Sequence, residues 1–226
     1  MNVKIISSAN LDGLSGHQVV VLDIFRASNT IMALLHNGAS RVYLLGEIHQ
    51  AFALKKQLPS ALLCGERKGE TIEGMEAGNS PTQAGHLPLS GRKVILTTSA
   101  GTQAVGRLCV MKEVAGIVFG SFANASHLVD YLLRRQQPVA LLPMGLEARE
   151  PALEDDLAAS FLQKMLLQQN PDFDNILPWL LSCEGSKRLL RLKQEQDLGF
   201  CTTLDRMPVI ATVQREKDLP PFAVLA

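Results

Sequence analysis

The sequence has few aromatic side chains, no excess of charge of either sign and no long apolar run. Aromatic residues make up 5% of its 226 residues, and 22 basic residues balance 22 acidic ones. No basic cluster stands out, so the chain offers no surface suited to a nucleic-acid backbone or an anionic membrane. No stretch approaches the ~18 consecutive apolar residues of a membrane span. We therefore expect neither a nucleic-acid nor a membrane partner, and a bound anion would need a local pocket.

The four cysteines show no metal-binding or redox spacing. Cys64, Cys109, Cys183 and Cys201 are far apart and include no CxxC pair. This pattern disfavours a zinc site or a disulfide framework and predicts buried free thiols in a reducing cytosol. The apolar run within residues 1–6 is too short for a signal peptide and is more typical of a first strand. We expect a cytoplasmic protein.

Several common catalytic motifs are absent. The patterns GxSxG, GxGxxG and GxxxxGK[ST] do not occur, so nothing indicates a hydrolase elbow, a dinucleotide site or a P-loop. The five histidines show no paired metal spacing. We assign none of them as a general base.

Two segments of the sequence resemble each other when Asp23 is aligned with Thr97. Apolar runs at 19–23 and 42–46 then match runs at 93–97 and 116–120. A third run at 61–65 matches 139–143 after a small insertion in the second copy, and a helical pattern lies between successive runs. The runs are short and lack polar alternation, which is typical of strands buried on both faces. Such periodicity also arises by chance in unrelated α/β proteins, so the repeat itself is a hypothesis.

These patterns predict an α/β protein with a three-layer α/β/α fold and a mostly parallel sheet, since helices that connect parallel strands cross over to either face. The sheet would be built from two similar β-α-β-α-β halves at about 18–69 and 92–149, followed by C-terminal helices and a strand at 150–226. We expect all of this to form one unit.

Polar residues gather in the loops that follow the predicted strands, where ligands of open α/β sheets bind. Asp23 ends the first full strand, and Arg26 follows near a helix start. An acid there can ligate Mg²⁺ or act as a nucleophile, and an arginine can hold an oxyanion with two hydrogen bonds. Glu66 and Arg67 lie between Gly65 and Gly69, where backbone N–H groups can form an anion nest. The alternatives are that Asp23 caps the next helix and that 65–69 is a solvated turn.

Hydroxyl groups mark two strand-to-helix junctions. Thr97, Thr98, Ser99 and Thr102 surround Gly101, and Ser121 and Asn124 occupy a similar place after 116–120. A helix N-terminus with nearby hydroxyls can bind an anion, although helix capping explains the same residues. Glu154, Asp155 and Asp156 open an amphipathic helix, where they could supply hard oxygen ligands or merely stabilise the helix dipole.

Seven segments, in order, resemble the signature segments of the 2-phosphosulfolactate phosphatase family. They are residues 22–28, 65–67, 72–74 with 78–81, 97–98 with 101–102, 120–122 with 124–125, 154–155, and 200–201 with 205. The resemblance implies a three-layer α/β/α fold and a Mg²⁺-dependent phosphatase. Its substrate would be 2-phosphosulfolactate, giving sulfolactate and phosphate, a step toward coenzyme M in methanogens.

The combined interpretation gives each candidate residue a role. Asp23, Glu66 and one of Asp155 or Asp156 would supply oxygen ligands to Mg²⁺, and Arg26 and Arg67 would hold the two anionic groups of the substrate. Asp23 is also the leading nucleophile, and direct attack by water stays open. The predicted substrate-binding residues are Ser28, Thr97, Thr98, Ser99, Gly101, Thr102, Ser121 and Asn124.

The sequence departs from the family pattern near the predicted anion site. Ala100 stands where we expect Asn, and Gln103 stands where we expect Arg. The loss of a guanidinium would weaken the binding of a dianion. Three alternatives therefore stay open: a different phosphorylated substrate, a broad sugar- or hydroxy-acid-phosphate hydrolase, and a non-catalytic protein that binds a small anion. Trp179, Leu180 and Leu181 would contact a second subunit in a homodimer or else belong to the core.

Overall fold

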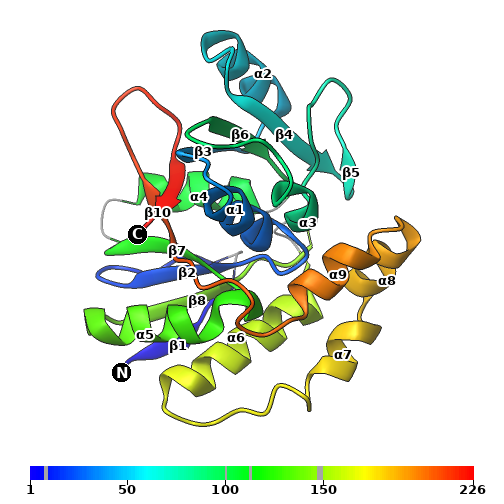
Figure 1. The fold of residues 1–226 in the computed structure, drawn as a ribbon. Coiled ribbons are helices and arrows are strands. Elements are labelled where there is room, and N and C mark those ends of the chain that lie inside the picture. The colour runs from blue at the N-terminus through cyan, green and yellow to red at the C-terminus, as the bar shows by residue number, and fades with distance from the viewer. Residues whose placement is uncertain (8–9, 100, 112–113, 147–149) are drawn as a thin grey trace.

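The chain forms one twisted sheet of ten strands with helices on both sides (Figure 1). The computed structural model describes all residues except 8–9, 100, 112–113 and 147–149, and also leaves out the side chains of 103 and 104. The strands are β1 (Val3–Ile5), β2 (Gln18–Leu22), β3 (Arg41–Leu45), β4 (Leu62–Arg67), β5 (Glu70–Thr71), β6 (Lys93–Thr97), β7 (Gly116–Gly120), β8 (Val139–Pro143), β9 (Ala211–Gln214) and β10 (Phe222–Leu225). Their order across the sheet is β1-β8-β2-β7-β9-β10-β3-β6-β4-β5.

Helices connect most of the parallel strands. They are α1 (Ala27–His36), α2 (Ile48–Gln57), α3 (Pro81–Ala84), α4 (Gly101–Val110), α5 (Ala125–Arg135), α6 (Leu153–Leu166), α7 (Leu177–Ser182), α8 (Glu184–Arg191) and α9 (Glu195–Cys201), with a short 3₁₀ helix η1 (Phe122–Asn124). The predicted α/β class with a mostly parallel sheet is confirmed. No helix in the described part of the chain is both long and apolar enough to span a membrane.

The two segments predicted as similar halves exchange their first strands. β2 lies between β8 and β7, and β6 lies between β3 and β4, with every one of these pairs parallel. Each first strand thus pairs with the second and third strands of the other segment. The predicted order of strand, helix, strand, helix, strand is observed in both segments, whereas their origin as copies of one unit stays a prediction.

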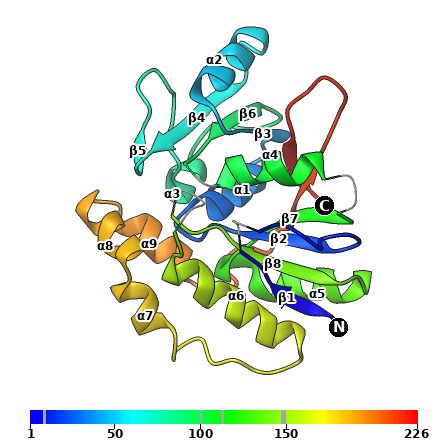
Figure 2. The same ribbon diagram turned by 180° about the vertical axis from the view of Figure 1, so that it is seen from behind.

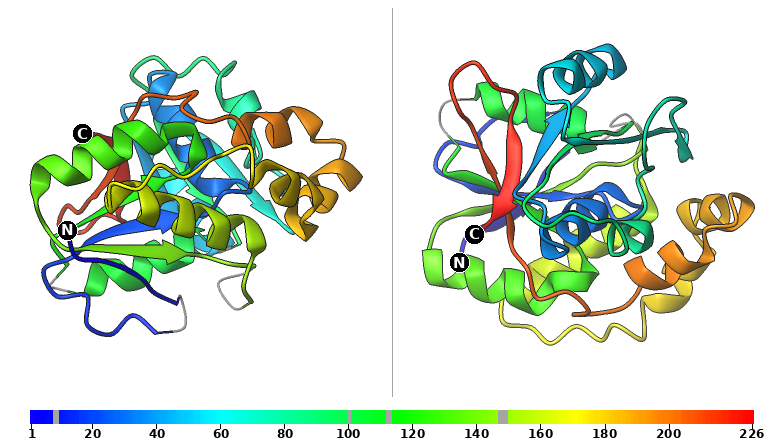
Figure 3. Two further views of the ribbon diagram at one scale, coloured as in Figure 1. Left: turned by 90° about the horizontal axis from the view of Figure 1, so that it is seen from below. Right: turned by 45° about the horizontal axis from the view of Figure 1, so that its top comes forward.

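A C-terminal hairpin joins the two groups of parallel strands. The sequence analysis expected one final strand near 209–213, but the structure has β9 and then β10, both antiparallel to their neighbours. β10 follows Pro220 and Pro221 and is short, so its sequence resembled the end of a loop. The Phe222 ring packs edge-on against the Tyr43 ring of β3 with 5.7 Å between centroids. The hairpin is red in the right view of Figure 3.

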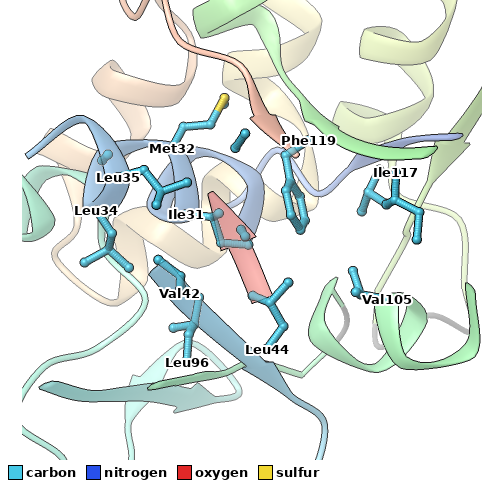
Figure 4. Packing of buried hydrophobic residues seen from close by; sticks show 14 of the residues in the cluster. Ile31, Met32, Leu34, Leu35, Val42, Leu44, Leu96, Val105, Ile117 and Phe119 are labelled. Carbon is cyan, nitrogen blue, oxygen red and sulfur yellow. The ribbon is translucent and has the colours of Figure 1, made fainter. Parts of the chain in front are cut away.

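The sheet bends around α1 and α4, which lie between β3 and β6 on one side and β2 and β7 on the other (Figures 1 and 2). Every residue from Ala27 to Leu35 in α1 is buried, as expected of a helix enclosed on all sides. Ile31 and Met32 pack in one cluster with Leu44 and Phe119 (Figure 4). This core fixes the start of α1, and with it the loop that carries Asp23.

The outer faces of the sheet have separate cores. Alternate residues of the strands, such as Val20 and Val118, point away from α1 and pack against α5 and α6. Tyr43 and Ile95 face α2 in the same way. In the left view of Figure 3, α5 and α6 lie across the strands near the N-terminus. Helices α8 and α9 lie beyond the end of β2, with α9 beside α3 and α7 farther along, beside α6 (Figure 1). Helix α8 helps to enclose the candidate site.

Candidate active site

A pocket of about 260 Å³ opens beyond the carboxyl ends of β2, β4, β6 and β8. It is lined by Asp23, Phe25, Arg26, Glu66, Lys68, Gly69, Asn79, Ser99, Gly145, Leu146, Ala152, Glu154, Asp155, Arg188 and Leu189. Five residues singled out from the sequence therefore meet here, namely Asp23, Arg26, Glu66, Ser99 and Asp155. We call this cavity the active pocket.

Asp23 combines two roles that the sequence analysis treated as alternatives. Its Oδ1 accepts a hydrogen bond from the Ala27 N–H at 3.1 Å, so it caps α1, and its side chain also lines the active pocket. Burial raises the pKa of Asp23 to about 6, and the charges of Glu66 and Glu154 act in the same direction. The Ala27 N–H and the charge of Arg188 act against the rise. The protonated form of Asp23 is therefore favoured more than in an exposed aspartate.

Glu66 holds two loops of the active pocket together. Its Oε1 accepts from the Ser99 N–H at 2.8 Å, and its Oε2 accepts from the Gly69 N–H at 2.8 Å and from Ser99 Oγ at 3.2 Å. The Gly69 N–H, which we had predicted to face a bound anion, donates to a carboxylate of the protein instead. The glycine-flanked segment thus forms a turn around Glu66.

Asp155 anchors the loop between β8 and α6. Its Oδ1 accepts from the Ile24 N–H at 2.8 Å, and its Oδ2 accepts from the Gly145 N–H at 2.9 Å. Burial raises the pKa of Asp155 well above its usual value, and the nearby charges of Asp23 and Glu154 add to the effect. Gly145 has φ +69, and a Cβ there would lie 2.1 Å from Glu150 O. Only glycine can therefore occupy position 145, where the backbone passes close to the Glu150 carbonyl and donates to Asp155.

The first turn of α6 presents Glu154, and not Asp156, to the active pocket. Glu154 is buried and lines the cavity, whereas Asp156 is exposed and does not. Each residue of a helix is rotated by about 100° from the one before it, so three consecutive acids cannot share one face. The prediction of Asp156 as a metal ligand therefore has no support from its position. Glu154, which was considered with it but not chosen as a ligand, is the acid that lines the active pocket.

Arg26 is already occupied by a partner that the sequence did not reveal. Its Nη1 donates to Asp197 Oδ2 at 2.5 Å, and its Nη2 donates to the Gly69 carbonyl at 3.1 Å. The two charged side chains are 3% and 4% exposed. Arg26 lines the active pocket, but its terminal nitrogens do not form the free oxyanion clamp that we predicted. Asp197 lies in the first turn of α9 and was given no role in the sequence analysis.

Arg67 lies outside the active pocket. Its Nη1 donates to the Glu66 carbonyl at 2.7 Å, while its Nη2 donates to the Gly46 carbonyl at 2.8 Å and to Thr97 Oγ1 at 3.0 Å. Its position ties the ends of β3, β4 and β6 together. The predicted role of Arg67 in holding the substrate is thus not supported by its place in the fold.

Lys68 and Arg188 line the active pocket instead. Arg188 Nη2 donates to the Phe25 carbonyl at 3.0 Å, and its Nε is buried with no partner among the described residues. The sequence analysis missed Arg188 because it lies in the strongly amphipathic helix α8, where a basic residue usually faces solvent. Lys68 was seen within the 65–69 segment but was given no role.

The hydroxyl groups after β6 mostly cap α4. The Thr98 N–H donates to Thr102 Oγ1 at 3.1 Å, and the Thr102 N–H donates to Thr98 Oγ1 at 3.3 Å. Thr97 accepts from Arg67, and Gly101 begins the helix. Of the predicted group only Ser99 lines the active pocket. Ala100 and the side chain of Gln103 lie outside the described residues.

Ser28, Ser121 and Asn124 are buried structural residues. Ser28 Oγ donates to the Val21 carbonyl and accepts from the Asp23 N–H. Ser121 and Asn124 form a capping box at η1, and Ser121 Oγ also donates to Asn29 Oδ1 at 2.7 Å. These contacts match the capping alternative. None of the three residues lines the active pocket.

Comparison with known proteins settles the family. Residues 5–216 match the family model described as 2-phosphosulpholactate phosphatase. The chain belongs to this family. Three relatives are each named as a probable 2-phosphosulfolactate phosphatase. The protein of Carboxydothermus hydrogenoformans is 36% identical over 210 residues, covering 85% of this chain and 84% of the relative. That of Thermotoga petrophila is 34% identical over 208 residues (86% and 88%), and that of Prochlorococcus marinus is 33% identical over 233 residues (92% and 93%).

Membership in the 2-phosphosulfolactate phosphatase family confirms the resemblance seen in the sequence and makes the chain a phosphoric monoester hydrolase by class. The residues of the active pocket suit such chemistry. Four carboxylates, from Asp23, Glu66, Glu154 and Asp155, line one cavity together with two basic side chains that are not held in ion pairs within the described structure.

The predicted Mg²⁺ can be tested against these carboxylates. No group of three or more His, Cys, Asp or Glu side chains among the described residues is arranged to hold a metal ion. Mg²⁺ usually takes only one or two carboxylates and completes its shell with water and substrate phosphate oxygens. Because Glu66 and Glu154 add to the raised pKa of Asp23, a cation beside Asp23 would relieve their repulsion. Carboxylate oxygens are the donor type that a hard divalent ion takes, and these side chains are the ones that would hold it.

Proposed function

We propose that the chain is a Mg²⁺-dependent phosphatase that acts on a small phosphorylated hydroxy acid. 2-Phosphosulfolactate is the first candidate, because the named relatives carry that substrate in their names. The observation that carries the proposal is the position of Asp23 just after β2, in one cavity with other carboxylates and with Lys68 and Arg188.

Asp23 is the proposed centre of the chemistry. With Glu154 or Glu66 it would hold Mg²⁺, which would offset the negative charge on phosphate oxygens when bound. Hydrolysis breaks the bond between phosphorus and the hydroxy-acid oxygen and adds an oxygen from water to phosphorus. Asp23 can serve either as the first nucleophile or as the residue that positions the water, but a single carboxylate oxygen cannot both ligate the metal and attack phosphorus.

The substrate anions are proposed to bind Lys68 and Arg188, with Ser99, whose N–H and hydroxyl both donate to Glu66, beside them in the active pocket. Arg188 is oriented by the bond from its Nη2 to the Phe25 carbonyl, which leaves its unpartnered Nε as a donor. Ser99 lies at the strand-to-helix junction before α4, beside Glu66. These groups take the place that the sequence analysis gave to Arg26 and Arg67, because both of those guanidinium groups are held by the protein.

The test is phosphate release from 2-phosphosulfolactate and 2-phospholactate, with Mg²⁺ and with EDTA. We expect metal-dependent release that disappears in Asp23→Asn, because the carboxamide is neither a nucleophile nor a good Mg²⁺ ligand. Full activity of the variant would refute the assignment of Asp23. Binding of these acids without any phosphate release by the folded protein would favour the non-catalytic alternative that Ala100 and Gln103 suggested.

Two further expectations remain proposals. Trp179 and Leu181 are 62% and 46% exposed and are candidates for a homodimer contact, whereas Leu180 is fully buried and belongs to the core. Trp179→Lys should therefore turn a dimer into a monomer in light scattering if this face mediates association.

All four cysteines are free, which supports our expectation of a reducing compartment such as the cytoplasm.

A further inference from the structure

A second cavity lies directly beside the active pocket. It has a volume of about 430 Å³ and is formed by α3, the loop before it and the segment that joins α8 to α9. Arg26, Gly69 and Asn79 line both cavities. We call it the side pocket and use Asn79, Thr82, Gln194 and Asp197 to define it. The shared residues mean that a molecule in the active pocket lies next to the side pocket.

Three buried polar atoms of the side pocket lack partners. They are Asn79 Oδ1, Thr82 Oγ1 and Gln194 Oε1, none of which has a hydrogen-bond partner among the described residues. Asn79 as a whole is only 5% exposed. Buried polar atoms in native proteins nearly always have a partner, from protein, water or ligand. Asn79, Thr82 and Gln194 line the side pocket, and unpartnered polar atoms on three different segments around one cavity indicate a polar binding site.

Neighbouring hydrogen bonds determine which atoms of these side chains are left to bind a ligand. Gln194 Nε2 donates to the Gly69 carbonyl at 3.3 Å, which leaves the amide oxygen as the free end. The Thr82 N–H donates to Asp197 Oδ1 at 3.1 Å and holds the residue in place. The site thus offers amide oxygens that accept hydrogen bonds and a hydroxyl that both donates and accepts. A ligand with hydroxyl groups can satisfy all three.

The buried charges of the side pocket cancel each other. Arg26 and Asp197 form an ion pair at 2.5 Å with both side chains almost fully buried. Asp197 also accepts from Ser80 Oγ at 2.7 Å, so neither charge is left to attract a charged ligand group. The other ionisable side chains that line the side pocket, His86, Lys193 and Glu195, are exposed to solvent, so the buried part of the side pocket suits a neutral group.

We propose that the side pocket binds the neutral, hydroxylated tail of the substrate whose phosphate lies in the active pocket. The preferred substrate is then a phosphorylated hydroxy acid with a polyhydroxylated chain, longer than lactate or sulfolactate. This inference rests on the proposed phosphatase function. A free polyol presents the same chemistry, so the experiment has to separate the two sources.

The kinetic test compares 2-phosphogluconate, which has a hydroxylated tail, with 2-phospholactate, which has none. In the wild type we expect a higher kcat/KM for 2-phosphogluconate. Thr82→Val removes the unpartnered hydroxyl while keeping the shape, and the ratio of the two kcat/KM values should fall roughly 3- to 10-fold, as the loss of one hydrogen bond implies. Thr30→Val is the matched control, because Thr30 Oγ1 is also buried without a partner but lies in α1, away from both pockets. It should leave the ratio unchanged.

A binding measurement separates this inference from the phosphatase proposal. Saturation-transfer NMR with sorbitol should show binding to the wild type and to Thr30→Val, and weaker binding to Thr82→Val. If no phosphate is released from any substrate but sorbitol behaves in this way, the phosphatase proposal fails and the side pocket stands as a polyol site. If 2-phospholactate is hydrolysed but neither the ratio nor sorbitol binding responds to Thr82→Val, water alone fills the side pocket and the inference is overturned. Sorbitol binding without a preference for 2-phosphogluconate would overturn the substrate-tail assignment.

Discussion

Asp197 and Arg26 form a buried ion pair, 2.5 Å long, that joins α9 to the loop after β2. Asp197 also receives hydrogen bonds from Ser80 Oγ and the Thr82 N–H. One carboxylate therefore fixes the C-terminal helices, the segment around α3 and the wall of the active pocket. Because both side chains are buried, the charge of each residue is stabilised mainly by its partner and not by water.

Asp197→Asn should destabilise the protein strongly, since it leaves the Arg26 charge buried without a counter-charge. Loss of one partner of a buried pair costs about 3–5 kcal/mol, and urea unfolding would measure it. Glu184→Gln is the control. It breaks the solvent-exposed pair of Glu184 with Lys187, and exposed pairs contribute little. Equal stability of the two variants would show that the Arg26–Asp197 pair is not the structural link that its burial suggests.

The stability of the metal-free protein should depend on the protonation of Asp23. Its pKa is raised from 3.8 to about 6 by burial and by neighbouring carboxylates. The folded state then holds a proton between these pH values that the unfolded state releases, so stability falls as pH rises from about 4 to about 6. The free energy of unfolding falls by at most about 3 kcal/mol over this range, since each unit of pKa difference corresponds to about 1.4 kcal/mol.

Asp23→Asn should remove this loss, because an amide does not titrate. With EDTA present we expect the variant to be more stable than the wild type at pH 7 and to show a smaller decline from pH 4 to pH 6, both measured by urea unfolding. An unchanged decline would mean that another group carries the titration. The same variant should gain nothing from added Mg²⁺, whereas the wild type should be stabilised by it.

The sequence was sufficient to predict the sheet because buried parallel strands leave an unambiguous signature. The runs at 93–97 and 116–120 became β6 and β7 with unchanged boundaries. It was not sufficient for β10, since a short run after two prolines has no periodicity to detect. The exchange of β2 and β6 between the two halves is likewise a matter of long-range pairing, which periodicity does not report.

Site residues were harder to predict because capping and ligand binding use the same residue types. Thr98, Thr102, Ser121 and Asn124 had the composition of an anion site, yet their hydrogen bonds join side chains to backbone groups and, from Ser121 Oγ, to Asn29 Oδ1. Arg26 and Arg67 differ from Arg188 only in which partners lie near them in space. Local sequence cannot show such partners, as the distance along the chain between Arg26 and Asp197 illustrates.

Cysteine reactivity offers a simple check on the packing. Burial raises the pKa of Cys64 to about 12, and burial together with the charge of Asp197 raises that of Cys201 well above its usual value. Because the thiolate is the reactive form, iodoacetamide at pH 8 should leave both unmodified in the folded protein. Cys109 is only partly buried and should react first. Mass spectrometry after denaturation should find all four modified, and fast labelling of Cys64 in the native state would contradict the described core.

Arg188 is predicted to hold a substrate anion, and its neighbour in sequence supplies the control. Arg188→Gln removes the charge and the buried Nε donor that faces no partner in the described structure. Loss of a charge-assisted hydrogen bond of about 1.5–3 kcal/mol should lower kcat/KM by roughly 10- to 150-fold. Lys187→Gln removes a positive charge one residue earlier on α8, at a side chain that is 54% exposed, and should leave kcat/KM unaffected.

The separate values of KM and kcat show when the Arg188 contact acts. A rise in KM at constant kcat in Arg188→Gln would indicate a contact made equally in the ground and transition states, whereas a fall in kcat would indicate one that strengthens as the phosphorus–oxygen bond breaks. Equal activity of both variants would remove Arg188 from the site and leave Lys68 as the remaining basic candidate for the phosphate.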